Sequence, residues 1–259
     1  MTIAEIVANK DILIAQKKAG IKHADGVFTD FHAPKLNKVL TIKADSENED
    51  PTKLQVKAII NTTNILDSHG DVHIKGLWSK SLKENKMIMH LQEHSLKFES
   101  IISDGKDLKA STKAYTFKEL GYNLEGETQA LVFDSTIKMD RNKFMFEQYQ
   151  KELVKNHSVG MRYVKLFLAV NDEDYKEEFD IWNKYYPQIA NKETADNQGY
   201  FWAVTEAKVI EGSAVPIGSN QITPTLEITE AAKSTSKTIE PSNDTHKISK
   251  SNIINHLII

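Results

Sequence analysis

The sequence predicts an α+β fold, with a mostly antiparallel β-sheet or β-barrel core and a few surrounding helices. Seven short stretches favour β-branched or aromatic residues, and several of them alternate apolar with polar residues. Two other stretches, 140–155 and 173–185, carry large apolar residues at helical spacing. A chain of 259 residues with 40% hydrophobic residues is long enough to bury the core of one or two domains.

The β-rich stretches lie between residues 39 and 210, and turn signals such as Asp104-Gly105 separate some of them. The expected strands are residues 39–43, 54–61, 98–103, 108–115, 130–138, 159–170 and 200–210. Together with the two helical stretches they define a main domain that we expect to span residues 26–228.

Residues 2–20 are predicted to form one amphipathic helix, which we treat as a separate element, residues 1–25. Thr2 and Glu5 have the spacing of a capping box, and Gly20 is expected to end the helix in the left-handed conformation. The apolar stripe of this helix consists of Ile3, Ile6, Val7, Leu13 and Ile14. Such a stripe predicts packing on the domain or on a partner.

The last part of the chain, residues 229–259, has a different composition. It is rich in Ser, Thr, Lys and Asn, so it cannot bury enough surface to offset the entropy of ordering. We expect a flexible tail. It ends in an apolar cluster, residues 253–259, which is either a docking peptide or a frayed terminus.

Composition excludes several classes of protein. The 33 Lys and Arg against 36 Asp and Glu give no general basic surface for nucleic acid. The lack of cysteine excludes disulfide scaffolds, thiol nucleophiles and cysteine zinc sites. No apolar run reaches the about 20 residues of a membrane helix, and Glu5, Lys10 and Asp11 interrupt any secretory signal. We therefore expect a soluble intracellular protein.

The histidine-containing segments are the first place to look for chemistry. Residues 67–71 read as a tight turn, because Asp and Gly supply local hydrogen bonds and permissive dihedral angles. In an extended strand His69, Asp71 and His73 would share a face, which leaves a metal site as the alternative. A second segment holds His90 and His94, which share a face in a strand or a helix.

A third segment, residues 156–163, follows the first predicted helix and enters an apolar strand. Strand alternation points Ser158, Gly160 and Arg162 to one side, and His157, Val159 and Met161 to the other. Gly160 would leave room beside the Ser158 hydroxyl, and Arg162 would place positive charge close by. The same alternation argues against His157 as a base for Ser158.

A fourth segment places Glu211 among apolar residues. An ionised carboxylate in such surroundings needs a partner, and a histidine N–H is a suitable one. The alternative is a glutamate at a strand end that reaches water.

Four stretches occur in a particular order along the chain. They are Asp67-Ser68-His69-Gly70-Asp71-Val72 continuing through Gly76-Leu77-Trp78 to Ser81-Leu82, Leu91-Gln92-Glu93-His94, His157-Ser158-Val159-Gly160-Met161-Arg162, and Glu211-Gly212-Ser213-Ala214-Val215-Pro216 with Asn220 beyond. In this order they resemble the tailed-phage (caudovirus) prohead serine protease family, which is related in fold to the herpesvirus assemblin proteases. The resemblance covers roughly residues 40–228 and implies a herpesvirus-protease-like barrel.

The sequence also departs from the family pattern. Trp78 stands where a Phe is more usual, Ser95 where an Asp often follows the histidine, and Gly212 where a β-branched residue is common. Residues 171–205 resemble an enlarged insertion, which we expect to reshape the substrate groove.

The resemblance implies a serine endopeptidase that needs no cofactor or metal. Ser158 would be the nucleophile, His94 the general base and acid, and Glu211 the third member, with His90 as the alternative because the herpesvirus enzymes use a second histidine there. Backbone N–H groups near Val159 and Gly160 would form the oxyanion hole, with Arg162 as auxiliary.

Family membership further implies the biology. The expected substrates are the scaffold protein, the scaffolding segment of the major capsid protein, and the protease itself. The expected location is the host cytoplasm, inside the assembling procapsid, without direct contact to nucleic acid or membrane. Dimers are usual among the herpesvirus relatives, which leaves self-association open. The rival readings are an inactive protease-fold scaffold, a metal-dependent hydrolase using His69, Asp71 and His73, and a nucleic-acid-binding capsid component.

Overall fold

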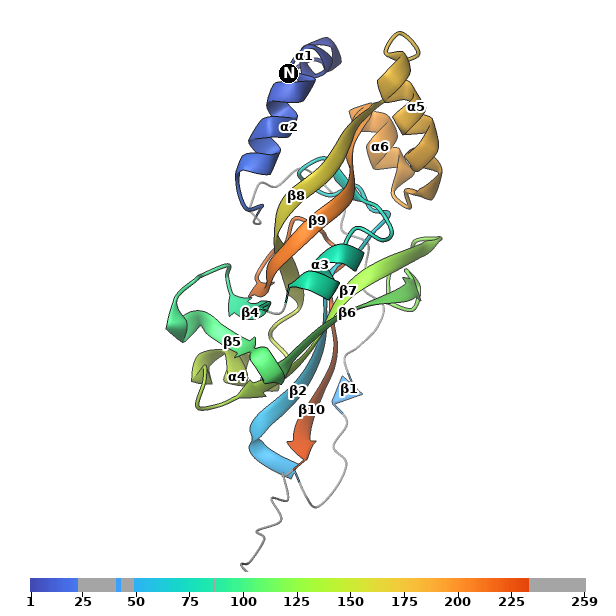
Figure 1. Ribbon diagram of the computed structural model, residues 1–259. Coiled ribbons are helices and arrows are strands. Elements are labelled where there is room, and N and C mark those ends of the chain that lie inside the picture. The colour runs from blue at the N-terminus through green and yellow to red at the C-terminus, as the bar shows by residue number, and fades with distance from the viewer. Residues whose placement is uncertain (23–40, 43–48, 86, 233–259) are drawn as a thin grey trace, which may run out of the picture.

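The computed structural model describes residues 1–22, 41–42, 49–85 and 87–232, whose strands form two open five-stranded sheets (Figure 1). The first sheet has the spatial order β1 (Thr41–Ile42), β10 (Thr225–Ala232), β2 (Glu49–Asn61), β7 (Glu127–Lys138) and β6 (Leu108–Thr116). Its pairs are antiparallel except β1 with β10.

The second sheet is built around the long strand β9 (Tyr200–Val215). One side of β9 pairs antiparallel with β8 (Asn156–Val170) along its whole length. The other side pairs parallel with two short strands in turn, β3 (Asp71–His73) and β4 (Met89–Gln92), and β5 (Ile101–Asp104) extends β4. The predicted α+β class is confirmed. The predicted closed barrel is not found among the described residues, because each sheet keeps its edge strands.

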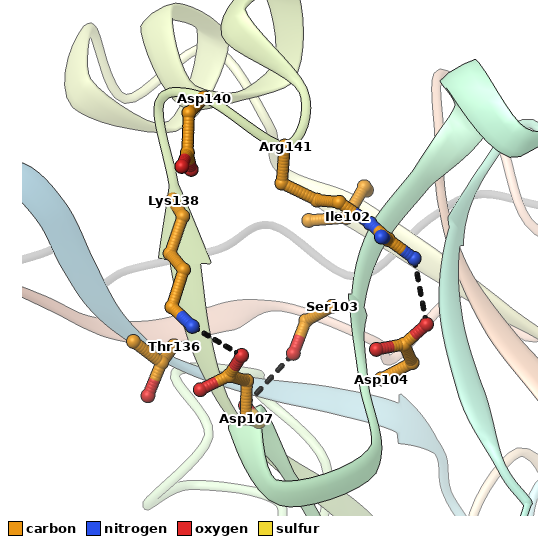
Figure 2. A pocket seen from close by; sticks show the side chains of 8 residues that line it. All are labelled: Ile102, Ser103, Asp104, Asp107, Thr136, Lys138, Asp140 and Arg141. Carbon is orange, nitrogen blue, oxygen red and sulfur yellow. Dashed lines mark hydrogen bonds and ion pairs between the residues drawn. The ribbon is translucent and has the colours of Figure 1, made fainter.

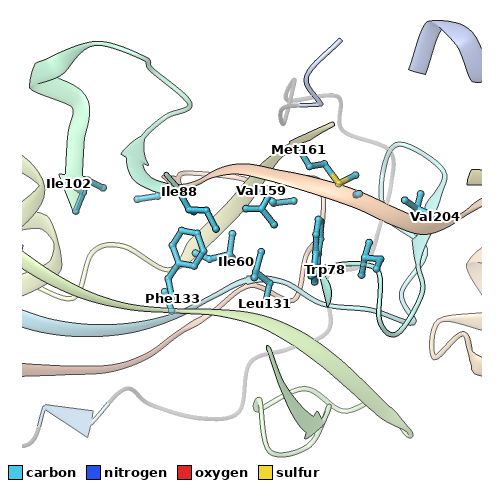
Figure 3. Close-up of a cluster of buried hydrophobic side chains, with 14 of the residues drawn as sticks. Ile60, Trp78, Ile88, Ile102, Leu131, Phe133, Val159, Met161 and Val204 are labelled. Carbon is cyan, nitrogen blue, oxygen red and sulfur yellow. The ribbon is translucent and has the colours of Figure 1, made fainter. Parts of the chain in front are cut away.

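The main core fills the space between the two sheets (Figure 3). Phe133 on β7 and Ile60 on β2 lie so close to β9 that a Cβ atom on Gly212 would come within 2.5 Å and 2.7 Å of them. Val159 and the fully buried Trp78 belong to the same cluster. The side of β8 and β9 that faces these residues is called the inner face below, and the opposite side the outer face.

Among the described residues, six α-helices and three short 3₁₀ segments surround the sheets. The α-helices are α1 (Ile3–Ala8), α2 (Lys10–Ala19), α3 (Ser79–Glu84), α4 (Lys143–Gln150), α5 (Lys176–Tyr185) and α6 (Lys192–Gln198). The 3₁₀ segments are η1 (Phe98–Ser100), η2 (Gly105–Asp107) and η3 (Tyr186–Gln188). The predicted helices near 140–155 and 173–185 correspond to α4 and α5. In the part of the chain that the structure describes, no helix has the length and apolar character needed to cross a membrane.

The N-terminal residues form two helices rather than the single helix predicted. The capping box is present, since Glu5 N–H donates to Thr2 Oγ1 at 3.3 Å and Thr2 N–H to Glu5 Oε2 at 2.8 Å. The break lies at Asn9, whose side-chain amide donates to Glu5 O at 2.8 Å. Such side-chain hydrogen bonds to the backbone compete with helical hydrogen bonds, which is why Asn is disfavoured in helices. Gly20 does not adopt the predicted left-handed conformation; it is extended, because the chain continues into a β-bridge at Lys22.

The C-terminal boundary of the predicted main domain, residue 228, differs from the structure. Strand β10 continues past residue 228 to Ala232, since it pairs with β2 as far as Glu49. The remaining tail, 233–259, and the N-terminal boundary at residues 25–26 lie outside the described residues.

Residues 171–205 form α5, η3, α6 and the start of β9, which pack around a second cluster that includes Trp182, Phe201 and Leu66. They lie at the tip of the β8–β9 pair, where Val170 faces Tyr200. Ser158 lies twelve residues further back along β8. The expectation that this segment reshapes a groove at Ser158 is therefore not supported.

Candidate active site

Ser158 lies on the outer face of β8. It pairs with Ser213 of β9, and Gly160 pairs with Glu211, so the side chains of these residues share one face. His157 points to the inner face, where its Nε2 lies 2.9 Å from Tyr149 Oη. The predicted alternation is confirmed, and His157 is turned away from Ser158.

His94 and Glu211 are brought into contact although 117 residues separate them. His94 Nδ1 lies 2.6 Å from Glu211 Oε1. Because an ionised carboxylate only accepts hydrogen bonds, Nδ1 carries the proton and Nε2 is the basic nitrogen. Ser213 connects the same groups, since its hydroxyl donates to Glu211 Oε2 at 2.6 Å and accepts from the His94 backbone N–H at 3.0 Å.

The backbone that carries His94 is in an uncommon conformation. Glu93 and His94 both have positive φ, 52° and 56°, directly after β4. The turn is held by Glu93 N–H donating to Ala214 O at 3.0 Å and Ser95 N–H to Gln92 O at 2.9 Å. Left-handed non-glycine residues cost about 1–3 kcal/mol each, and such strain gathers at functional sites. Here the strained turn directs the imidazole back toward β9.

Gly160 accommodates the acid rather than the serine. A Cβ atom on residue 160 would lie 1.8 Å from Glu211 Oε1, so only glycine leaves space for that carboxylate. The predicted space beside the Ser158 hydroxyl stays a prediction, since the close atom that the structure shows belongs to Glu211. Glu211 is fully buried and His94 is 9% exposed at its side chain, so the contact between them is shielded from water.

Ser158 itself is 3% exposed. The contacts described above join His94 to Glu211 through its side chain and to Ser213 through its backbone N–H. Directly opposite residues in an antiparallel pair have Cβ atoms about 4.5–5.5 Å apart, which places Ser158 next to Ser213 and thus beside the dyad. Catalytic hydrogen bonds are often longer in an empty site than in a complex.

The predicted oxyanion and auxiliary groups are only partly brought together. Neighbouring N–H groups of a strand point in opposite directions, so Val159 N–H faces the free edge of β8 while Gly160 N–H faces β9. Gly160 N–H is therefore not available beside Val159 N–H. Arg162 is exposed and pairs with Lys208, about 13 Å along the strand from Ser158, so it does not reach the hydroxyl directly.

His90, the alternative third member, belongs to a buried chain on the inner face. Its Nδ1 lies 3.0 Å from Ser135 Oγ and its Nε2 3.1 Å from Tyr149 Oη. The same phenol contacts His157, whose Nδ1 donates to Thr223 O at 3.0 Å. Burial lowers the pKa of His90 to about 3, with His157 adding to the effect, and burial lowers the pKa of His157 to about 4. The contact geometry therefore favours Glu211 over His90 as partner of His94.

The predicted turn at residues 67–71 is confirmed. Asp67 Oδ1 accepts from the N–H groups of His69 and Asp71 at 2.9 and 3.0 Å, and Gly70 has a φ of 73°. The turn holds Asp67 and Asp71 together in a buried position.

These two carboxylates form ion pairs with two lysine side chains. Lys22 Nζ lies 2.6 Å from Asp67 Oδ2 and 2.7 Å from Asp71 Oδ2, and Lys17 Nζ lies 2.7 Å from Asp71 Oδ1. Burial alone would lower the pKa of Lys22, but the two carboxylates raise it above its ordinary value. Burial conversely opposes ionisation of Asp71, yet Lys22 and Lys17 lower its pKa.

The residues that could form a metal site differ from those predicted. The donor atoms that approach within 4.8 Å of one another belong to Asp67, Asp71 and His73, not to the predicted set with His69. His73 Nδ1 contacts the Asn61 side chain at 2.8–3.0 Å, and burial lowers its pKa to about 4. The Lys22 ammonium group occupies the cation position between the carboxylates, which removes the need for a metal there.

A separate surface pocket lies at the end of β7 near the β5–β6 connection (Figure 2). Four of its charged groups are paired, Lys138 with Asp107 at 2.5 Å and Arg141 with Asp104 at 2.7 Å. Neither Ser158 nor the His94–Glu211 pair lines it, and we assign it no chemistry.

Two contributors to the site were not given a role from sequence. Ser213 was quoted only as part of a motif, although its spacing of two from Glu211 puts both on one strand face. Lys22 had no local signal, because its partners lie 45 and 49 residues away.

No family model matches the sequence, and no curated protein or solved structure matches it either.

Proposed function

We propose that the protein is a serine endopeptidase with Ser158 as nucleophile, His94 as general base and acid, and Glu211 as the group that orients and stabilises His94. The observation that carries the proposal is the buried 2.6 Å contact between His94 Nδ1 and Glu211 Oε1 on the face of the sheet that also bears Ser158. A base held in one tautomer by a buried acid is the arrangement that nucleophilic catalysis by serine requires.

In the proposed reaction His94 Nε2 takes the Ser158 hydroxyl proton while Oγ attacks the peptide carbonyl carbon. Glu211 stabilises the imidazolium that forms, and Ser213 holds the second carboxylate oxygen in place. The imidazolium then protonates the leaving amine as the C–N bond breaks. Water, activated by the same histidine, hydrolyses the acyl-enzyme. Val159 N–H is the backbone donor that we assign to the oxyanion.

The biological assignment rests on the resemblance to prohead proteases and their herpesvirus-protease-like fold. We place the protein inside an assembling procapsid in the host cytoplasm, where it cleaves the scaffold or the scaffolding segment of the major capsid protein, and itself. Self-association into a dimer belongs to the same proposal. Proteolytic removal of an internal scaffold makes maturation irreversible. Co-expression with the cognate capsid protein, followed by intact mass measurement, tests this role.

Labelling with a fluorophosphonate probe tests the peptidase chemistry directly. The wild-type protein is expected to be labelled at Ser158, and Ser158→Ala to lose labelling and about 10⁶-fold in turnover. Ser111→Ala, on β6 of the other sheet, is the matched control and is expected to keep both. Labelling of Ser158→Ala at the wild-type rate would refute the nucleophile.

An inactive protease-fold scaffold is the second candidate. The observation that favours it is the low exposure of Ser158, 3%. A folded wild-type protein that resists the probe and leaves the cognate capsid protein intact would support this candidate and contradict the first.

A further inference from the structure

A chain of buried polar groups crosses under β9 on the inner face. Ser135 Oγ lies 3.0 Å from His90 Nδ1, and His90 Nε2 lies 3.1 Å from Tyr149 Oη. The same phenol oxygen lies 2.9 Å from His157 Nε2, and His157 Nδ1 lies 3.0 Å from Thr223 O. All five residues are 0% exposed. The proposed reaction uses none of them, although three of them are titratable.

The backbone carbonyl at one end of this chain fixes the direction of every hydrogen bond in it. A carbonyl oxygen only accepts, so His157 Nδ1 carries the ring proton. Burial lowers the pKa of His157 to about 4, which keeps the ring neutral at pH 7, and its Nε2 therefore accepts from the Tyr149 hydroxyl.

The same reasoning continues through the phenol to the other histidine. Burial raises the pKa of Tyr149 well above its ordinary value, so the phenol keeps its one proton, which it donates to His157. The phenol oxygen then accepts from His90 Nε2–H, and His90 Nδ1 accepts from the Ser135 hydroxyl. The two histidines must therefore carry their protons on different ring nitrogens.

The Tyr149 hydroxyl joins two strands that are not neighbours. His90 on β4 pairs with Gly212 of β9, and His157 on β8 pairs with Ala214 of β9, so β9 lies between the two histidines. Neighbouring strands lie about 4.8 Å apart, which places β4 and β8 roughly 10 Å apart. Tyr149, on α4, spans this separation through its two imidazole contacts.

The same two strands carry the proposed nucleophile and lead to the proposed base. Ser158 directly follows His157, and His94 lies four residues after His90. On the outer face both are gathered around Ser213, which pairs with Ser158 and accepts from the His94 backbone N–H at 3.0 Å. A change in the separation of β4 and β8 would therefore move the nucleophile relative to the base.

Thr223 fixes the end of the chain that lies next to Ser158. Besides the contact of its carbonyl with the His157 ring, its Oγ1 accepts from His157 N–H at 3.2 Å and donates to His157 O at 2.7 Å. The residue before the nucleophile is thus held at its ring and at both of its backbone polar groups.

We propose that Tyr149 is a positioning residue, whose hydroxyl sets the separation of β4 and β8 and so holds Ser158 within reach of His94. The inference rests on the proposed peptidase function and adds to it a group that does not touch the substrate. The bonds of the chain run in one direction, from Ser135 through His90, Tyr149 and His157 to the Thr223 carbonyl.

The tautomers of the two histidines test the chain without any need for turnover. In ¹⁵N spectra of the full-length protein at pH 7, His90 is expected to carry its proton on Nε2 and His157 on Nδ1. A His90 ring protonated on Nδ1, or a His157 ring protonated on Nε2, would overturn the inference, because the phenol could not then bridge the rings in the assigned order.

Tyr149→Phe tests the positioning role, since it removes the bridging oxygen and keeps the aromatic ring. The labelling rate of Ser158 at saturating fluorophosphonate is expected to fall about tenfold, because a misplacement of about 1 Å can cost about 10²-fold. The probe concentration that gives half of that rate is expected to stay within about twofold, because uniform binding of the probe is not changed. A folded Tyr149→Phe that is labelled at the wild-type rate would overturn the inference.

The matched control is Tyr163→Phe, which removes another buried hydroxyl from the same sheet. Tyr163 lies on β8 five residues after Ser158, and its hydroxyl donates to Asp71. A hydrogen bond to a charged group contributes more to stability than one between neutral groups. We therefore expect Tyr163→Phe to lower the urea midpoint at least as far as Tyr149→Phe and to keep the wild-type labelling rate. Equal losses of labelling in both variants would show that labelling only follows stability, and would overturn the inference.

A second pair of variants serves in case Tyr149→Phe does not fold. Thr223→Val removes the hydroxyl that holds the His157 backbone, whereas Thr223→Ser keeps it. The valine variant is expected to lose labelling about tenfold at saturating probe, and the serine variant to retain it. Equal labelling of the two variants would overturn the inference.

The wild-type measurements separate this inference from the proposed function. A wild-type protein that is not labelled, but shows the two expected tautomers, contradicts the peptidase function while the buried chain stands. A wild-type protein that is labelled, but shows other tautomers, supports the peptidase function and overturns the role of Tyr149.

Discussion

The replacement Gly160→Ala probes whether the Glu211 carboxylate is needed where the structure holds it. The new Cβ atom would lie 1.8 Å from Glu211 Oε1, whereas ordinary contact begins at 3.4 Å. The oxygen therefore has to move by about 1.6 Å. That displacement breaks the 2.6 Å contact with His94 Nδ1.

The expected loss of activity follows from the size of this displacement. A misplacement of about 1 Å in a catalytic group can cost about 10²-fold, and removing the orienting acid of a triad costs about 10⁴-fold. Gly160→Ala is therefore expected to lower the fluorophosphonate labelling rate of Ser158 by about 10²- to 10⁴-fold. Overpacking is expected to lower the free energy of unfolding by about 1–3 kcal/mol as well.

The matched control is Gly212→Ala, which overpacks the opposite face of the neighbouring strand. Its Cβ atom would meet Phe133 at 2.5 Å and Ile60 at 2.7 Å, in the core and away from the carboxylate. We expect a similar loss of stability, measured by urea unfolding, with labelling within about threefold of wild type. If folded Gly160→Ala kept more than a tenth of wild-type labelling, the assignment of Glu211 would be refuted.

Two further predictions concern stability. Lys22→Met leaves Asp67 and Asp71 without their shared cation and is expected to lower the free energy of unfolding by about 3–5 kcal/mol, measured with urea at pH 7. The control Lys118→Met breaks an exposed ion pair and should lower it by under about 1 kcal/mol. Equal losses in the two variants would contradict a stabilising buried pair. Lowering the pH is expected to destabilise the protein, because buried His73, His90 and His157 have folded-state pKa values of about 4, 3 and 4, below the ordinary 6.5. Their stabilising contribution is present above pH 6.5 and is lost as the pH falls toward those values, since only the unfolded chain takes up the protons. The expected loss is roughly 2 kcal/mol per histidine between pH 6.5 and 4.5, and His90→Gln should reduce it by about a third. Unfolding curves that coincide at the two pH values would disprove this reasoning.

Local patterns predicted the parts of the fold that depend on short-range physics. Alternation placed Ser158 and His157 on opposite faces, and the Thr2–Glu5 spacing gave the capping box. The order of motifs put His94, Ser158 and Glu211 together as a set, and the His94–Glu211 contact agrees with that grouping.

Such local patterns could not predict contacts between residues that are far apart in the sequence. Nothing near Gly20 indicates that the chain leaves its helix extended, because the cause is the pairing of Lys22 with Met161. The contact between Gly160 and Glu211 was missed for a similar reason, since the atom that needs this space lies on another strand. Short strands such as β3, of three residues, carry too few side chains to show a period.

The wide separation of His94, Ser158 and Glu211 along the chain has a consequence for biosynthesis. During translation Glu211 is the last of the three to be made, after more than 200 residues. Strand β9, which carries it, must then pair with β8 on one side and β4 on the other before the His94 imidazole is oriented. Closing such distant contacts is the slow part of folding. A chain whose β9 has not yet paired would thus lack the oriented imidazole, so the proposed hydrolysis would wait for this late pairing.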